Sequence, residues 1–131
     1  MNDNSEILAE LDRAKKALKS AEVLLNQKLL EDSISRSYYA VLHAAKAALL
    51  SKGISVDSHD AVKKLFGLHL IKSGEIDKQY GMILREEQDD RLLADYNVRF
   101  MPEEERVFRR IEDARDFIFT IEQFLKGKMD S

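Results

Sequence analysis

Hydrophobic residues recur along the chain at three- and four-residue steps, which is the spacing of one face of an α-helix. The first such segment spans residues 4–27, and its apolar seam is Ile7, Leu11, Ala14, Leu18, Ala21 and Leu25. The last spans residues 102–126, with the seam Val107, Ile111, Ala114, Ile118, Ile121 and Leu125, broadened by Phe108, Phe117, Phe119 and Phe124. Seams this regular predict long helices that pack side by side in a bundle.

The segment from residue 31 to residue 52 contains no glycine or proline and is apolar on most sides. Its main stripe consists of Tyr38, Leu42, Ala45 and Leu49, and further alanines fill much of the remaining surface. A helix of this kind is expected at the centre of the fold, with other helices on several faces. Gly53 follows at the position of a C-terminal cap.

Two further helices are predicted between these segments. A shorter helix spans residues 59–73, with Ser58 or Asp57 as its N-cap and Gly74 after its end, and a long helix spans residues 75–96. Residues 97–101 are expected to form a loop, and residues 127–131 to fray. Short connections between long helices require antiparallel neighbours. The predicted fold class is therefore all-α, an up-down bundle of four long helices and one shorter helix.

Composition narrows the function classes. The chain has 131 residues and a formal net charge of -3, which argues against a nucleic-acid module that relies on bulk positive charge. It has no cysteine, which excludes disulfides, thiolate catalysis and cysteine metal sites. The first ten residues are polar and acidic, and no apolar run approaches the roughly 20 residues that cross a bilayer. We therefore expect a cytoplasmic protein without a membrane partner.

One arginine and one histidine interrupt the central apolar helix. Arg36 and His43 are seven residues apart, so they share one face about two turns apart. A histidine can take the 2′-hydroxyl proton of RNA while an arginine stabilises the charged phosphate, so this pair could cleave RNA without metal. The alternative is structural: both side chains satisfy partners inside the bundle.

A second polar cluster lies on the fourth predicted helix. Glu87, Arg91 and Asp95 follow one another at four-residue spacing, and Tyr96 is adjacent. They form either a solvated ladder of ion pairs or part of a network between helices, with Arg36 as a candidate partner of Asp95. On the first helix, the run Asp12, Arg13, Lys15, Lys16 and Lys19 is interpreted as a solvated face with an Asp12–Lys16 pair.

Metal and cofactor motifs are not found in the sequence. The three histidines, His43, His59 and His69, do not share the four-residue spacing of helical metal ligands, and no glycine-rich phosphate loop occurs. We therefore expect no metal and no cofactor.

The combination of an Arg-x-x-Tyr-Ala motif with a later Arg-x-x-x-Asp-Tyr motif resembles the HEPN domain family (higher eukaryotes and prokaryotes nucleotide-binding), especially its small stand-alone prokaryotic members. The residues that carry it are Arg36, Tyr39, Ala40, His43, Arg91, Asp95 and Tyr96. The similarity extends over residues 8–125.

This resemblance implies one domain over residues 1–131, with a core at about residues 5–126, that forms a four- or five-helix bundle and is commonly a homodimer. Many relatives act beside a minimal nucleotidyltransferase in toxin–antitoxin pairs. Active members cleave RNA through an arginine followed, after four to six residues, by a histidine. Arg36 and His43 fit that spacing, although on the second helix rather than later in the chain, where the motif usually lies.

Three functional hypotheses remain. The first is a dimeric module that binds a nucleotide, RNA or a nucleotidyltransferase partner through a polar groove formed by Arg36, Tyr39, His43, Arg91, Asp95 and Tyr96. The second is a metal-independent endoribonuclease toxin, with His43 as general base and Arg36 or Arg91 as the phosphate ligand. The third is a purely structural oligomerisation bundle whose polar residues form a buried network.

Overall fold

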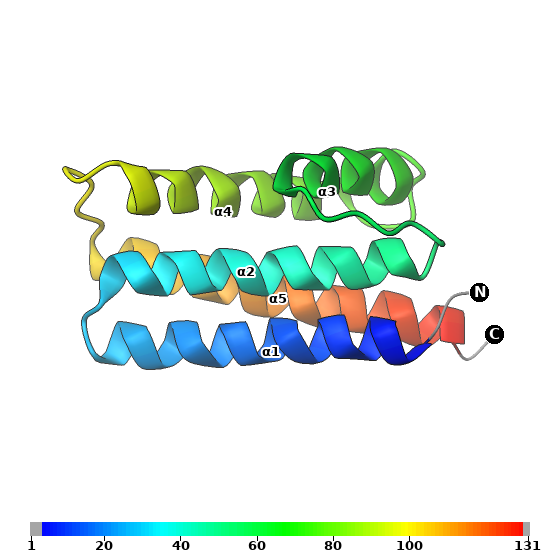
Figure 1. Ribbon diagram of the computed structural model, residues 1–131, viewed down its shortest axis with the longest axis horizontal. Coiled ribbons are helices and arrows are strands. Elements are labelled where there is room, and N and C mark those ends of the chain that lie inside the picture. The colour runs from blue at the N-terminus through cyan, green and yellow to red at the C-terminus, as the bar shows by residue number, and fades with distance from the viewer. Residues whose placement is uncertain (1–3, 130–131) are drawn as a thin grey trace.

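The computed structural model describes residues 4–129, and this part of the chain is entirely helical apart from its connections. The elements are α1 (Asn4–Asn26), α2 (Leu30–Leu50), α3 (His59–Phe66), the short π-helical segment η1 (Gly67–Ile71), α4 (Lys78–Tyr96) and α5 (Glu104–Met129). The four long helices alternate in direction along one axis, and the short α3 lies beside α2 and α4 (Figure 1). The all-α prediction is confirmed.

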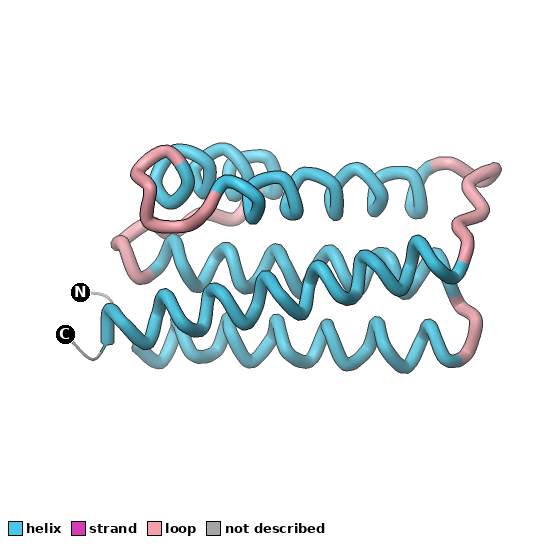
Figure 2. Tube along the Cα trace, turned by 180° about the vertical axis from the view of Figure 1, so that it is seen from behind, coloured by secondary structure: helices cyan, strands magenta, loops and turns pink. Residues whose placement is uncertain are grey.

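Helix α2 is the centre of the bundle. It contacts every other helical element, whereas α1 and α4 do not contact each other within the described residues. Its alanines at positions 40, 44, 45, 47 and 48 are fully buried. Because an alanine side chain ends at Cβ, neighbouring helices can approach the α2 backbone closely from several directions. The view from behind shows α5 running the length of the bundle in front of α2 (Figure 2).

The apolar seams form the core largely as the sequence predicts. All six seam residues of α5 are buried, and four of the six in α1 are buried while Leu18 and Leu25 are half-buried. Phe117 joins this core, with its ring centroid 5.4 Å from that of Phe66. The prediction for Phe108 and Phe119 is wrong: their exposed fractions are 55% and 59% because they lie outside the face of α5 that contacts α1 and α2.

Several helix boundaries differ from the predictions. The third helix changes to a π-helical turn at Gly67 rather than continuing regularly to residue 73. Helix α4 begins at Lys78 because Asp77 caps it, its carboxylate accepting from the Gln79 backbone N–H, and Ile76 is buried ahead of the helix. Helix α5 continues through Met129, so residues 127–129 do not fray. Residues 130 and 131 lie outside the described part of the chain.

Two acidic residues of α4 are buried between helices. Glu87 has an exposed fraction of 0%, and Ser37 Oγ lies 2.9 Å from its Oε1 and 3.0 Å from the Arg110 carbonyl oxygen. Burial raises the pKa of Glu87 well above its ordinary value. A protonated Glu87 can donate to the Ser37 hydroxyl, whose own proton then goes to the Arg110 carbonyl. Glu87 thus joins α4 to α2 and α5. It is not part of the predicted ladder of ion pairs with Arg91 and Asp95.

Asp90 is buried as well, but it keeps its charge. Its two oxygens accept from Arg106 Nε and Nη2 at 3.1 and 2.6 Å, and Arg110 Nε donates at 2.8 Å. Burial alone would raise the pKa of Asp90, but these arginine hydrogen bonds outweigh it and lower the pKa below its usual value. Three charge-assisted hydrogen bonds therefore tie α4 to α5.

None of the described helices combines the length and the apolar character that a membrane crossing requires.

Replacing Glu87 with glutamine tests its protonation. Because the folded-state pKa of Glu87 is raised, the wild type loses stability as pH rises from the unfolded pKa towards the folded one. Glutamine does not titrate. We expect the free energy of unfolding of E87Q, relative to wild type, to increase with pH by up to about 1.4 kcal/mol per pH unit in that window. Urea denaturation at pH values from 4 to 8 measures it.

The control is Glu86→Gln, which makes the same change at the exposed neighbouring position. Parallel stability curves for wild type and E87Q across this pH range would show that Glu87 does not carry a proton in the folded state.

Enlarging an alanine of α2 tests its central packing. Ala44 is fully buried, so A44L has to push a neighbouring helix away. We expect a loss of about 1–3 kcal/mol in the free energy of unfolding. A leucine at the exposed Arg109 of α5 is the control, and equal effects at the two positions would contradict close packing around α2.

Candidate functional site

An open groove of about 610 Å³ runs between α1 and α2. Its lining residues are Ala9, Asp12, Arg13, Lys16, Ala17, Ser20, Arg36, Tyr39 and His43. The structure thus brings Arg36, Tyr39 and His43, three of the residues singled out in the sequence, to one surface of α2.

Arg36 is exposed rather than buried. Its guanidinium carbon lies 4.6 Å from the centroid of the Tyr39 ring, a cation–π contact that holds the charge at the groove. The predicted pairing of Arg36 with Asp95 is not what the structure shows, because Asp95 has other partners. A guanidinium that faces the groove is available to an anion there.

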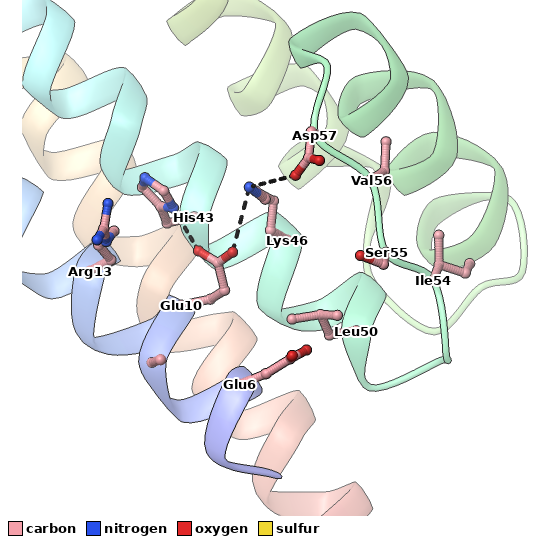
Figure 3. Close-up of a pocket in the computed structure, with 11 residues that line it drawn as sticks. Glu6, Glu10, Arg13, His43, Lys46, Leu50, Ile54, Ser55, Val56 and Asp57 are labelled. Carbon is pink, nitrogen blue, oxygen red and sulfur yellow. Dashed lines mark hydrogen bonds and ion pairs between the residues drawn. The ribbon is translucent and has the colours of Figure 1, made fainter. Parts of the chain in front are cut away.

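His43 is held by a carboxylate from the neighbouring helix. Its Nδ1 lies 2.6 Å from Oε1 of Glu10, and its side chain is 17% exposed. An ionised carboxylate can only accept, so Nδ1 carries the hydrogen and Nε2 keeps a lone pair in the neutral ring. The other oxygen of Glu10 pairs with Lys46 Nζ at 3.5 Å (Figure 3). Glu10 and Lys46 therefore set both the tautomer and the orientation of this imidazole.

Tyr39 connects the groove to α4. Arg91 Nη2 donates to the Tyr39 hydroxyl at 3.4 Å. The Arg91 guanidinium also lies within 6 Å of three tyrosine ring centroids, at 5.6 Å from Tyr38, 5.8 Å from Tyr39 and 5.9 Å from Tyr96. Arg91 and Tyr39 are thus in direct contact, although Arg91 itself does not line the groove.

The partners of Asp95 are Arg91 and Ser35. Arg91 Nε lies 2.8 Å from Asp95 Oδ2, and the Ser35 hydroxyl donates to Oδ1 at 2.6 Å. The second polar cluster is therefore a network between α2 and α4 rather than a solvated ladder on α4. Tyr96, next to Asp95, has an exposed fraction of 74%. Asp95 and Tyr96 lie at the α4 end of this network and do not line the groove.

Sequence reasoning did not assign His59 to the site. Its ring centroid lies 5.9 Å from that of Tyr39, edge to face, and 5.5 Å from that of Tyr38. Burial lowers the pKa of His59, and the charges of Arg91 and Lys46 lower it further, so this ring is neutral at pH 7. Burial also raises the pKa of Tyr38 to about 12. Tyr38 and His59, whose rings pack against Tyr39, are thus uncharged.

The cations of α1 were also missed as site residues. Arg13 and Lys16 line the groove opposite Arg36, although the predicted Asp12–Lys16 pair does form, at 3.2 Å. A stripe at residues 9, 12, 13, 16 and 20 has helical spacing and borders the apolar seam. That stripe could have indicated a second side of the groove. The sequence, however, does not state which helix packs next to these residues.

Comparisons with known proteins identify the family of this chain. The family model described as HEPN domain matches residues 8–126. A protein of Methanocaldococcus jannaschii with the name "Putative toxin" is 37% identical over 121 residues, which cover 92% of this chain and 90% of that protein. A protein of Thermotoga maritima with the name "UPF0332 protein" is 31% identical over 127 residues, 96% of each chain. The chain belongs to the HEPN domain family.

Proposed function

We propose that this chain binds single-stranded RNA in the groove between α1 and α2. One observation carries the proposal: three cations, Arg13, Lys16 and Arg36, line the same open groove. Phosphate contacts with lysine and arginine supply most of the affinity of sequence-independent nucleic-acid binding. The formal charge of -3 does not oppose this, because the groove concentrates positive charge locally.

The aromatic side chain in the groove supports the same proposal. Tyr39 lines the groove and carries Arg36 over its ring. Proteins that bind single strands combine a basic groove with aromatic rings on which bases stack. The hydroxyl of Tyr39 is held by Arg91, so the ring is fixed before any ligand arrives. A nucleotide base could therefore stack near Tyr39 while its phosphate contacts Arg36.

A second candidate function is metal-independent cleavage of the bound RNA. It is favoured by the position of His43 in the groove that holds Arg36, with Nδ1 held by Glu10. In this proposal Nε2 of His43 accepts the proton of a 2′-hydroxyl, and the oxygen attacks the adjacent phosphorus. Arg36 stabilises the additional negative charge on the phosphate, and the 5′-oxygen leaves with a proton taken from water, to which His43 then returns the proton it accepted. The products are a 2′,3′-cyclic phosphate and a 5′-hydroxyl.

One relative carries the name "Putative toxin". If this chain is also a toxin, cleavage of RNA would account for its toxicity. The homodimer and the minimal nucleotidyltransferase partner that the family implies stay predictions. The third hypothesis, a purely structural bundle, relied on Arg36 being buried with a carboxylate. That reason does not apply, because Arg36 is exposed and contacts Tyr39.

Replacing Arg36 with alanine tests RNA binding. We expect weaker binding of a fluorescein-labelled single-stranded RNA and a salt dependence whose logarithmic slope is smaller by about 0.7, the value for one lost phosphate contact. Because Arg36 is exposed, the free energy of unfolding should change by no more than about 1 kcal/mol. Fluorescence anisotropy between 50 and 200 mM salt and thermal unfolding measure the two effects.

The matched control is Arg109→Ala. Arg109 is also an exposed arginine, but it lies on α5 and outside the groove. Unchanged RNA affinity for R36A would refute binding at this groove, and strong destabilisation would instead favour the structural hypothesis.

Replacing His43 with alanine separates binding from cleavage. With EDTA present, we expect wild-type protein to cleave RNA and H43A to be slower by roughly 10²- to 10⁴-fold, the usual contribution of a general base, while RNA affinity changes little. Gel analysis of the products and their 2′,3′-cyclic ends measures cleavage. His69→Ala is the control, since His69 lies on η1 and does not line the groove.

Three outcomes discriminate between the candidates. If the wild-type protein binds RNA without cleaving it, RNA binding is supported as the function and RNA cleavage is refuted. Cleavage that is unaffected by H43A would exclude His43 as the base, and cleavage that EDTA abolishes would exclude a metal-independent mechanism.

A further inference from the structure

A second hollow lies on the other side of His43. It has a volume of about 400 Å³ and is bounded by α1, by the end of α2 and by the link that follows α2, which supplies Ile54, Ser55, Val56 and Asp57. Three of its lining residues, Ala9, Arg13 and His43, also line the groove. The two hollows therefore meet at the imidazole, and one ligand could occupy both.

The two hollows carry opposite kinds of charge. The groove is lined by three cations and a single carboxylate. The second hollow, which we call the acidic pocket, is lined by three carboxylates, Glu6, Glu10 and Asp57, together with Arg13 and Lys46. A phosphate is therefore favoured in the groove, and a group with hydrogen-bond donors is favoured in the acidic pocket.

One wall of the acidic pocket is apolar. Leu50, Ile54 and Val56 line it, and each is half-buried against the main core of the bundle. They are thereby held in place with one side turned to the pocket. Aliphatic side chains of this kind suit the face of a planar ring. The acidic pocket thus combines a surface for a ring with acceptors for its edge, which a simple cation would not need.

The three carboxylates are not equally available. Glu10 is engaged by His43 and Lys46, and Asp57 lies 3.8 Å from the same lysine. The side chain of Glu6 has no hydrogen bond or ion pair among residues 4–129. Figure 3 shows its carboxylate extending from α1 toward the side of the pocket where Leu50 lies. Glu6 is thus the carboxylate of this pocket that no cation in the described part of the chain engages.

We propose that the acidic pocket is a base-selecting subsite for guanine, with Glu6 as the residue that determines specificity. Guanine presents two adjacent donors, N1–H and the N2 amino group, which the two oxygens of one carboxylate can accept together. Its neighbouring O6 is an acceptor that suits a cation of the pocket such as Lys46. The proposal rests on the proposed binding of RNA in the groove and adds to it the class of base.

The other bases fit the pocket less well. Adenine and cytosine each place one amino group beside a ring nitrogen that is itself an acceptor and would be repelled by a carboxylate. Uracil has one donor between two carbonyl groups. An arginine side chain of a protein partner could also pair with Glu6, but it would meet the positive charges of Arg13 and Lys46 in the same pocket. The observations therefore favour guanine.

The test is an NMR titration of the full chain with the 3′- and 5′-monophosphates of guanosine, adenosine, cytidine and uridine. We expect a guanosine monophosphate to bind at least about fivefold more tightly than the others, since a good bidentate contact discriminates at that level or above. The backbone amides of residues 54–57 should shift with guanosine more than with the other nucleotides. In Glu6→Gln the guanosine preference should disappear, while binding through the phosphate persists.

The matched control is Glu31→Gln. Glu31 is exposed in the first turn of α2, as Glu6 is in the first turn of α1, so both substitutions remove the same charge from the first turn of a helix. Circular dichroism of each variant verifies the fold. A loss of guanosine preference in both variants would mean that overall charge, not the contact with Glu6, is responsible, and the proposal would be wrong.

The remaining outcomes separate this proposal from the function on which it rests. Equal binding of all nucleotides, weakened by R36A and unaffected by E6Q, would leave the RNA groove intact and refute the guanine pocket. Failure of every nucleotide to bind would refute both. A further outcome is that Nα-acetyl-arginine amide shifts the amides of residues 54–57 while guanosine monophosphate does not. That result would refute guanine as the ligand of the acidic pocket and indicate an arginine side chain of a protein partner.

Discussion

The packing of alanine-rich α2 against every other helix is the constraint on which the rest of the structure depends. Because α2 contacts α1, α3, α4 and α5, most of its circumference is buried, and its polar side chains can reach solvent only where these helices leave it uncovered. The groove between α1 and α2 is such a place, and Arg36 and His43 lie in it. The position of the candidate site is thus a direct consequence of how completely the remaining faces of α2 are covered.

The buried acids of α4 show how this packing is made specific. Asp90 remains ionised because two arginines of α5 donate to it, whereas Glu87, only three residues earlier, has its pKa raised by burial beside Ser37. Hydrogen bonds to a buried charge, as at Asp90, and a pKa raised by burial, as at Glu87, are the two ways in which a carboxyl group is tolerated inside a fold. These contacts can form together only when α4 has one particular rotation about its axis relative to α2 and α5. They therefore disfavour other packings that the apolar faces alone would allow.

Much of this fold could be predicted from the sequence, because the period of the apolar residues determines which face of each helix is buried. The groove triad Arg36, Tyr39 and His43 could be predicted as a group for the same reason, since all three lie on one helix. The contacts between helices could not. Glu86 and Glu87 are adjacent and chemically identical, yet only Glu87 is buried, because successive residues of a helix point about 100° apart and the sequence does not state how α4 is rotated. Asp95 meets Ser35 rather than Arg36 for the same reason, and Glu10 reaches His43 from a helix whose neighbour is known only from the structure.

Local charge rather than net charge decides what such a surface can bind. At physiological ionic strength an exposed charge is largely screened beyond about 8 Å, so a ligand in the groove is affected mainly by the lining residues and little by acids elsewhere on the surface. The groove is lined mostly by cations and the acidic pocket mostly by carboxylates, although the two hollows share Arg13 and meet at His43. A nucleotide has the same asymmetry, with an anionic phosphate at one end and a base edge at the other. A ligand that spans His43 would therefore be oriented by this difference in charge, with its phosphate beside Arg36 and its base beside Glu6, and the imidazole would face the ribose that joins them.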